Sequence, residues 1–531
     1  MRPQHSAFVR LPAPFDTVTP EPISLFRLFF TDSILNTIVA NTNLYAAIKI
    51  ASKELPGRTW RPLELNELII WYALTVYIGL HRITPLAALW NLDKHGPVHT
   101  ISRHMSVTRY EQIKRYLHVS SPMDKSNHYF DKVEPLLSHV RDLSKKYYTP
   151  RSNVSVDEMI VRFSGRSAHT VRMKNKPMPE GFKIFSLCDA GYTYTFFPSS
   201  RIISAPVPDV PGLTKTGSMV CHLVEQLPYT HMAFNIYLDN YFSTVKLFQY
   251  FRNKGIGACG TARMQAGIPK ELQVEKNAKL DWDTRSGAVV DGVLVVFWQD
   301  NGPVTFLTTI HAVIGEEWEV ERERRRPRET STNATKVRAV FGSSPRKKLR
   351  ILKVVDDYNF NMGGVDIADQ LRSYYKTQQA AFRNWMPLFF WLLDTVIVNT
   401  FLISKKTGST LTQREFRASL VWGLINSVTQ TTRRSSRAEE KEEESQQKRQ
   451  KITKNYQLPS HRLTFGDHYP QWRDKRSTCT WCSWRASRSE IFMTHKNPNQ
   501  SQVWCVECDV ALCVNKTRNC FQDFHTQQNK V

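Results

Sequence analysis

Cysteine is scarce over most of this 531-residue chain and becomes frequent only near the C-terminal end. Six of the nine cysteines follow residue 478, so the chain lacks the evenly spread cysteine pairs of a secreted disulfide scaffold. Such a cluster is typical of metal ligation in a reducing compartment. We therefore expect metal-binding thiolates, not disulfide bonds, in this region.

Long apolar runs are also scarce, which argues against secretion and membrane insertion. Residues 1–23 are interrupted by prolines and lack the continuous apolar segment of a secretory signal, so we expect a flexible N-terminus. The best membrane candidate, residues 386–403, contains Asp394 and Asn399, whose polar groups are costly in lipid. This run therefore predicts a buried helix in a protein core.

Acidic residues are outnumbered by basic ones. The chain has 48 Asp and Glu against 72 Lys and Arg, which gives a formal charge of +24. Such an excess usually meets a polyanion, either nucleic acid or an acidic membrane face. The hydrophobic content of 41% fits a globular protein, and the length fits about two to four domains. With the cysteine distribution, these features predict an intracellular, nuclear protein.

The residue pattern changes several times along the chain, and we find no internal repeat. It predicts seven successive segments: helices over 24–153, short strands over 154–262, a small antiparallel meander over 263–345, a basic run leading into a glycine turn over 346–375, helices over 376–430, a disordered polar linker over 431–475, and a cysteine-rich module over 476–531.

The stretch YNFNMGGVDIADQ, residues 358–370, has two interpretations. A Gly-Gly turn followed by Asp is a common helix entrance, in which Asp366 would cap the first turn and Asp369 would lie within it. Because the two aspartates are three residues apart, both can also face one side of a helix and present carboxylates to a metal. These thirteen residues alone leave both interpretations open.

Two further aspartates lie on predicted strands. Asp157, in VSVDEMI, would share a strand face with Ser155 and Met159, and Asp239 ends the apolar run FNIYL. Each could simply cap a turn. Together with a helix-borne pair, they would form a cage of carboxylate oxygens suited to Mg²⁺. Two such ions would activate a nucleophile and stabilise the leaving oxygen of a phosphodiester.

The blocks that carry these acids resemble those of piggyBac-type transposases and the piggyBac transposable element-derived proteins. The similarity extends over roughly residues 24–531 and includes the cysteine-rich end. The matching stretches are VDEMIVRFSGRSAHTVRMKNKP with EGFKIFSLCDAGY for the first aspartate, YLDNYFST for the second, and YNFNMGGVDIADQLRSYY with NWMPLFFWLLDTVIVNTFL for the third.

The resemblance implies an α/β fold with an RNase H-like catalytic core. That core would comprise 154–262 and 346–375, with a β-rich insertion at 263–345. The helical segments 24–153 and 376–430 would form a flanking DNA-binding and dimerisation domain.

The resemblance also implies the site and its chemistry. Asp157, Asp239 and Asp366 would be the catalytic aspartates, Asp369 the accompanying fourth acid, and two Mg²⁺ ions the cofactor. The enzyme, a homodimer, would nick transposon ends in double-stranded DNA, close a hairpin with the free 3′-hydroxyl and join the ends to TTAA targets.

Basic residues near the aspartates are candidates for phosphate contacts, which would make DNA binding salt-sensitive. The alternative is an ordinary solvated face. The candidates are Arg162, Arg166, Arg172, Lys174, Lys176 and Lys183. Three aromatic residues, Tyr241, Phe242 and Trp385, would either stack on a splayed base or belong to the core.

Two Cys-x-x-Cys motifs, CTWC and CVEC, predict zinc near the C-terminal end. Seven ligand candidates lie here: Cys479, Cys482, Cys505, Cys508, Cys513, Cys520 and His525. Seven exceed the four ligands of one ion, so two zinc ions with interleaved ligand pairs are favoured over one zinc with spare cysteines. The eighth ligand is open between His468 and His495. The resemblance implies that this module recognises transposon ends or contacts chromatin.

The sequence thus favours a Mg²⁺-dependent DNA transposase that also carries Zn²⁺. One alternative is a domesticated, catalytically silent descendant that still binds DNA or chromatin. Another is that the cysteine-rich module acts chiefly as a reader of other proteins.

Overall fold

The computed structural model describes most of the chain, in two units. The described residues are 3–13, 15, 19–52, 59–91, 97–124, 128–173, 179–200, 202, 207–273, 280–312, 318–331, 333–429, 458, 460–464, 466–486 and 499–526. The larger unit is Met1–Val428 and the smaller is Thr429–Val531. Each unit is described by itself.

Helices dominate the N-terminal part of the larger unit, as the apolar periodicity predicts. Side-chain oxygens cap two of them: Thr31 Oγ1 accepts from Ile34 N, and Ser106 Oγ accepts from Arg109 N. The helices are α1 (Pro22–Phe29), α2 (Asp32–Ala51), α3 (Leu65–Leu80), α4 (Val107–Tyr116) and α5 (Leu136–Tyr147), with 3-10 turns η1 (Leu86–Trp90), η2 (Thr100–Arg103) and η3 (Tyr129–Val133).

The N-terminal segment is not a free lead-in, contrary to the sequence expectation. Strand β1 (Phe8–Val9) pairs with β2 (Tyr148–Thr149), and His5 N donates to Ser152 Oγ at 2.8 Å. The hydrogen-bond partners of these backbone groups lie far along the chain, so the local sequence pattern does not predict the pairing.

A nine-stranded mixed sheet forms the centre of the larger unit. Its order is β4-β5-β3-β7-β8-β11-β10-β9, with β6 paired to β5. The pairs β3–β7 and β7–β8 are parallel, and the other pairs are antiparallel. The strands are β3 (Asn153–Arg162), β4 (Val171–Arg172), β5 (Glu180–Asp189), β6 (Tyr192–Ser199), β7 (Asn235–Leu238), β8 (Gly257–Ala262), β9 (Arg285–Val290), β10 (Val293–Gln299) and β11 (Pro303–Thr308).

Helices connect the parallel strands. α6 (Lys215–Val224) precedes β7, and α7 (Val245–Asn253) links β7 to β8. Thr244 caps α7, and Gly255 follows it at a φ of +72°, a left-handed conformation that glycine adopts without strain. Gly255 N donates to Arg252 O at 2.9 Å, so the helix ends at this glycine.

The predicted meander is present but does not form a small sheet of its own. β9, β10 and β11 pair as expected around the Asp291–Gly292 turn. However, β11 also pairs with β8, with Thr308 opposite Cys259, so the meander extends the central sheet. Turn signals define a hairpin locally, but they do not say which other strand edge it joins.

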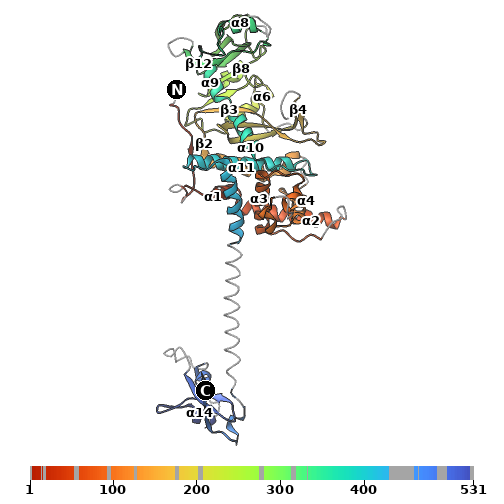
Figure 1. Ribbon diagram of the computed structural model, residues 1–531. Helices are drawn as coiled ribbons and strands as arrows, with labels where there is room; N and C mark the ends of the chain where they lie inside the picture. Colours follow the sequence, from red (N-terminus) through yellow and green to blue (C-terminus); the bar gives the residue numbers. More distant parts are fainter. Residues whose placement is uncertain are drawn as a thin grey trace. The chain divides into compact units, whose positions relative to one another are not determined.

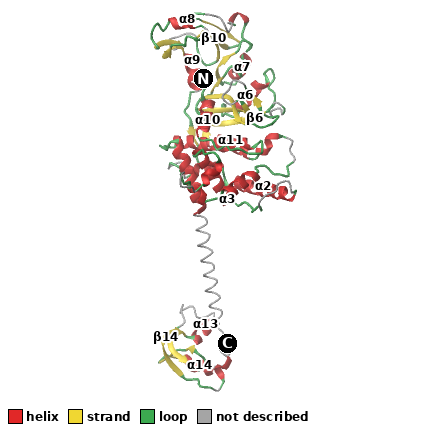
Figure 2. Cartoon of the chain, turned by 45° about the vertical axis from the view of Figure 1, so that its right-hand side comes forward, coloured by secondary structure: helices red, strands yellow, loops and turns green. Residues whose placement is uncertain are grey.

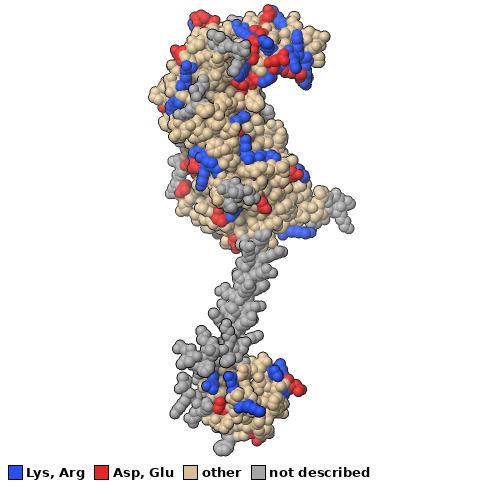
Figure 3. Space-filling view, turned by 90° about the vertical axis from the view of Figure 1, so that its left-hand side faces the viewer, with Lys and Arg blue, Asp and Glu red and all other residues tan. Residues whose placement is uncertain are grey.

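The two basic runs lie opposite each other in a separate ribbon, β12 (Glu319–Arg325) with β13 (Arg346–Leu352). Much of their charge is paired: Arg322 binds Asp356 at 2.7 Å, and Arg346 binds Glu323 at 2.8 Å. Figure 3 shows basic and acidic side chains intermixed at this end of the unit, where α8 (Ala334–Ala339) and β12 lie in Figure 1.

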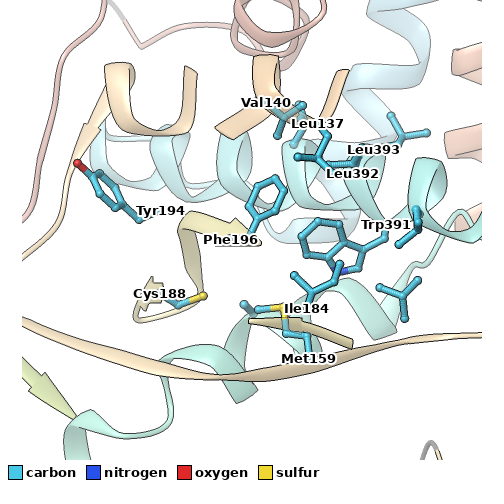
Figure 4. Close-up of a cluster of buried hydrophobic side chains, with 14 of the residues drawn as sticks. Leu137, Val140, Met159, Ile184, Cys188, Tyr194, Phe196, Trp391, Leu392 and Leu393 are labelled. Carbon is cyan, nitrogen blue, oxygen red and sulfur yellow. The ribbon is translucent and has the colours of Figure 1, made fainter. Parts of the chain in front are cut away.

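Helix α11 (Met386–Lys406) lies between the sheet and the N-terminal helices (Figures 1 and 2). It is long and apolar enough to cross a membrane, but 94% of its most apolar 18-residue stretch is buried inside the protein. The predicted buried core helix is therefore confirmed. On the sheet side, Trp391 meets Phe196 of β6 edge to face, with ring centroids 4.8 Å apart (Figure 4).

A buried ion pair holds the segment before α11. Asp394 is 3% exposed and Arg417, from a helix over 413–429, is fully buried. Arg417 Nη1 lies 3.3 Å from Asp394 Oδ1, and Thr377 N donates to Asp394 Oδ2 at 2.9 Å. Burial raises the pKa of Asp394, which the nearby guanidinium opposes. The pair fixes the chain between α10 (Gly364–Tyr374) and α11.

The described residues of the smaller unit form a three-stranded sheet, a two-stranded hairpin and two short helices. Trp481 and Trp484 are buried and stacked, with ring centroids 4.8 Å apart. Its elements are η6 (Ser460–Leu463), β14 (Pro470–Thr478), α13 (Thr480–Ala486), β15 (Gln500–Cys505), β16 (Val510–Ala511), β17 (Val514–Asn515), β18 (Arg518–Asn519) and α14 (Cys520–Thr526).

Order begins earlier in this unit than the sequence pattern indicates. β14 starts at Pro470, within the stretch 431–475 predicted as a disordered linker, because it pairs with β15. The first part of that linker, 431–457, lies outside the described residues.

Removing the cation of the buried pair should strongly destabilise the larger unit. Arg417→Leu leaves Asp394 buried without its partner, so we expect a loss of about 3–5 kcal/mol in the free energy of unfolding. Urea denaturation followed by tryptophan fluorescence measures it. The matched control is Arg414→Leu, an exposed position on the same helix, where a change within about 0.5 kcal/mol is expected. Equal stabilities of the two variants would contradict this role of Arg417.

Candidate functional site

Asp157 and Asp239 occupy neighbouring positions at the centre of the sheet. β3 and β7 run parallel, with Val156 opposite Leu238. Asp157 and Asp239 are the next residues on the two chains, so the same register places them beside each other. Because neighbouring strands lie about 4.8 Å apart, the two carboxylates start from adjacent backbone positions. The sequence alone did not give this register.

Backbone amides fix both carboxylates. Asp157 Oδ1 accepts from Glu158 N at 2.7 Å, and Asp239 Oδ1 accepts from Tyr241 N at 2.8 Å. The second contact is an Asx-type turn, which ends β7 and turns the chain toward α7. Each side chain is thereby oriented by its own local backbone.

Tyr358 lies close to both carboxylates and was missed by sequence reasoning. It belongs to α9 (Lys353–Asn361), and its hydroxyl lies 3.3 Å from Thr261 Oγ1 of β8. Burial raises the pKa of Tyr358 to about 12, and the negative charges of Asp239 and Asp157 act in the same direction. Its place in the quoted stretch YNFN, just before the glycine pair, was the available signal.

Helix α10 packs on the face of β3 that carries Asp157. A Cβ added at Gly364 would lie 2.5 Å from Ser155 Oγ and 3.1 Å from Cys188 O. Further along, Arg372 Nη2 lies 2.8 Å from Met159 Sδ. Ser155, Asp157 and Met159 occupy every second position of the strand, so their side chains share one face. The helix therefore runs past Asp157, and its first residue must be glycine to come so close.

The helix start differs from the sequence expectation. Gly363 is the N-cap and Asp366 the third helical residue, so Asp366 does not cap the helix, although it does lie in the first turn. Asp369 comes one turn later, because the helix already begins at Gly364. Asp366 is exposed, whereas Asp369 is half-buried and accepts from Arg372 Nη2 at 2.7 Å.

The four aspartates thus come from two strand positions and one helix. Asp157 and Asp239 are adjacent, and α10 brings Asp366 and Asp369 to the same side of the sheet. Carboxylate oxygens of this kind suit a hard divalent cation. Within the described part of the chain, the sets that bring three or more ligand atoms within 4.8 Å of one another are two cysteine and histidine sets, and the aspartates are not among them.

The predicted phosphate-binding residues have different surroundings. Arg162 and Arg166 are exposed and line a cleft, and Arg172 is exposed on β4. Lys183 is buried, 3.8 Å from Glu158 Oε2 and 4.4 Å from the Tyr241 ring centroid. Lys174 and Lys176 lie outside the described residues. Phosphate contacts by these residues stay a prediction.

Two of the three aromatic candidates belong to the core. Phe242 is 2% exposed and Trp385 is 3% exposed, so neither presents a ring to a partner. Tyr241 is 41% exposed and lies directly after the Asp239 turn. The cationic groups of Lys183 and Arg263 lie over the Tyr241 ring, so the ring is held beside the Asp239 turn.

The cysteines and histidines of the smaller unit form two compact sets of four. One set is His468, Cys505, Cys508 and His525, and the other is Cys479, Cys482, Cys513 and Cys520. The two sets interleave along the chain, as the two-zinc interpretation predicts. His468 takes the eighth position, and His495 lies outside the described residues.

The donor atoms fit tetrahedral zinc. Cys482 Sγ lies 3.6 Å from Cys520 Sγ and 3.9 Å from Cys513 Sγ. His468 Nδ1 lies 3.5 Å from the sulfurs of both Cys505 and Cys508. Zn–S bonds of about 2.3 Å place ligands at the corners of a tetrahedron about 3.8 Å apart. Hydrogen bonds from Cys482 and Cys520 lower the pKa of Cys479, and the same pairings raise the pKa of Cys482 and Cys520.

The larger unit matches known proteins. The model of the family described as Transposase IS4 matches residues 21–401. PiggyBac transposable element-derived protein 2 of Homo sapiens is 25% identical over 394 residues, which cover 72% of this chain and 61% of that protein. PiggyBac transposable element-derived protein 3 of Homo sapiens is 24% identical over 416 residues, covering 74% and 63%. The chain therefore spans about three-fifths of the length of these curated relatives.

A solved structure has the same fold. It is the cryo-EM structure of a piggyBac transposase synaptic complex with hairpin DNA. The match has a TM-score of 0.64 at 20% identity and covers 80% of this chain and 84% of that one. At this identity the likeness concerns the fold alone.

The contact between Gly364 and β3 can be tested with its neighbour as control. Gly364→Ala forces a methyl group against Ser155 and Cys188, so we expect a loss of about 1–3 kcal/mol in the free energy of unfolding. A Cβ at Gly363 would meet nothing within 4 Å, so Gly363→Ala should cost less than about 1 kcal/mol. Chemical denaturation of both variants decides it. Similar losses would show that α10 does not depend on this close approach.

Zinc content distinguishes the two histidines that the sequence left open. We expect about two zinc ions per chain in the purified protein, as two tetrahedral sites require. His468→Ala should lower the content toward one, whereas His495→Ala should leave it at two. Mass spectrometry of the metal content measures this. Two zinc ions in the His468 variant would remove that residue from the site.

Proposed function

The chain belongs to the piggyBac-type transposases of the Transposase IS4 family, and from this premise we propose that it is a metal-dependent DNA transposase. It would cleave DNA strands at transposon ends and transfer them to TTAA targets. The observation that carries this proposal is the in-register pair of Asp157 and Asp239, with the aspartate-bearing helix α10 packed beside it.

The sheet topology supports an RNase H-like core. β6, β5 and β3 form three antiparallel strands, and β7 and β8 follow parallel to β3. This is the strand arrangement of that fold. The meander β9–β10–β11 and the β12–β13 ribbon would be the insertion between the second and third aspartates.

The aspartates would hold the divalent cations. Asp157 and Asp239 would supply oxygens from the strands, and Asp366 and Asp369 from the helix. Bound Mg²⁺ supplies activation of the attacking oxygen and stabilisation of the leaving oxygen. The chain's own part is orientation: backbone amides hold Asp157 and Asp239, and Arg372 holds Asp369.

DNA would approach along the basic residues of the β3 hairpin. Arg162, the last residue of β3, and Arg166, in the turn that follows, are exposed, so they can contact phosphates of a DNA strand that extends away from the aspartates. A homodimer acting on two ends, a nuclear location, and DNA or chromatin contacts by the zinc unit belong to the same proposal.

A second candidate function is a transposase-derived protein that binds DNA without cleaving it. The observation that favours it is the naming of both human relatives as transposable element-derived. The intact aspartates favour the active enzyme. The two candidates differ in one property, cleavage, and share DNA binding.

The test uses supercoiled plasmid carrying the inverted repeats that flank the gene. With the full-length protein and Mg²⁺, we expect nicks and hairpin ends. Asp157→Asn, Asp239→Asn or Asp366→Asn should each reduce cleavage at least about a hundredfold, because metal ligands contribute several kcal/mol to transition-state stabilisation. End binding, measured with Ca²⁺ in place of Mg²⁺, should survive. The matched control is Asp142→Asn, an exposed aspartate on α5.

The outcomes separate the candidates. Wild-type protein that binds these ends but never cleaves them would be the silent form. Retained cleavage in one aspartate variant would remove that residue from the site.

A further inference from the structure

A large groove lies beyond the end of β3 and belongs to no part of the aspartate site. Its volume is 1510 Å³. Four parts of the larger unit line it: the end of α2, residues of 118–124 and 128–135, the turn after β3 over 162–166, and the segment 376–385 with Pro387 at the start of α11. The groove and the aspartates therefore share β3 and the chain that follows α10.

The groove wall is basic. Its exposed or half-buried Lys and Arg residues are Lys49, Lys132, Arg162, Arg166, Lys376 and Arg383. Three acids also line it, and two of them have partners: Asp131 contacts His128, and Glu134 accepts from Ser138 N and Oγ. Such a surface favours a polyanion over a neutral ligand.

One apolar side chain stands out on this wall. Phe382 has an exposed fraction of 105%, the highest among the large hydrophobic residues that the structure describes. Exposing a full phenyl ring to water is unfavourable. The segment around Phe382 has firm anchors.

Hydrogen bonds hold the chain on both sides of Phe382. Gln378 Nε2 donates to Arg162 O at 2.8 Å, and Gln379 Nε2 donates to Tyr110 Oη at 2.5 Å. On the other side, Arg383 Nη2 donates to Lys114 O at 2.9 Å, and Trp385 is buried. Arg383 also donates to Leu117 O, so its guanidinium joins this segment to the end of α4 at two points, and burial lowers its pKa to about 10. The exposed ring of Phe382 therefore projects from a segment that hydrogen bonds hold on both sides.

We propose that Phe382 stacks on an unpaired base of a DNA strand lying in this groove, an inference that rests on the proposed function. The cations would bind the phosphates and the ring would bind one base face, which is the combination that single-stranded DNA sites use. A ring already held in place loses little freedom on binding.

The distance to the aspartates fits this role. Arg162 lies five residues after Asp157 on β3, so the groove begins about 17 Å from the site at about 3.3 Å per residue. This corresponds to about five base steps of a DNA strand. A strand engaged at the aspartates can therefore enter the groove at Arg162. Paired bases, whose faces are covered by stacking, cannot use the Phe382 ring.

The experiment compares two fluorescent DNA probes with the full-length, zinc-loaded protein. Ca²⁺ replaces Mg²⁺, so that cleavage plays no part and the zinc sites are not stripped. One probe is a blunt duplex, and the other is the same duplex with a short single-stranded tail that contains 2-aminopurine. Fluorescence anisotropy gives the affinities. Quenching of 2-aminopurine reports stacking directly.

Wild-type protein should bind the tailed probe more tightly than the blunt one and quench its 2-aminopurine. Phe382→Ala should weaken tailed binding about tenfold, remove the quenching and leave blunt binding within about twofold, as loss of one base stack predicts. Phe382→Tyr should bind the tailed probe with wild-type affinity and should quench its 2-aminopurine. Phe360→Ala, a second exposed phenylalanine at 75% exposure, should keep the preference for the tail.

Four results would overturn the inference. A normal tail preference in Phe382→Ala, or equal losses on both probes, would remove the stacking role while DNA binding stands. Displacement of the tailed probe by polyglutamate but not by unlabelled single-stranded DNA would assign the groove to an acidic peptide. If wild-type protein binds neither probe, the proposed DNA function fails as well.

Discussion

The parallel, in-register pairing of β3 with β7 is the constraint on which the site depends. It brings Asp157 beside Asp239 although a hairpin and α6 separate them in sequence. α7 then returns the chain so that β8 continues the parallel part of the sheet, and Thr261 of β8 meets Tyr358. Gly364 lets α10 settle on the Asp157 face. A shift of β7 by one residue would turn Asp239 to the other face and dissolve this arrangement.

The segment between α10 and α11 connects the aspartates to the basic groove. The Asp394–Arg417 pair fixes its start through Thr377, and Gln378 ties it to Arg162 of the same strand that carries Asp157. A charged pair buried in a core of aromatic side chains is costly to place. Here the ion pair holds a polar turn whose exposed residues face the groove. It therefore positions the groove wall as well as stabilising the fold.

The smaller unit obtains its order differently. It has few buried apolar residues, and its two sets of four ligands interleave along the chain. Each zinc site would therefore tie together segments that the other site also holds, and metal binding would contribute folding free energy directly. The donor spacings found in both sets agree with this account.

The sequence by itself determined the local features. The long apolar run gave the buried helix α11, spacing gave the zinc ligands, and the resemblance to a transposase family singled out the four aspartates. Tertiary structure decided what depends on distant partners: the junction of β11 with β8, the pairing of β1, the choice of His468, the burial of Lys183 and Trp385, and the exposure of Phe382. Local patterns reflect energies between near neighbours, whereas register and burial reflect contacts between segments far apart in the chain.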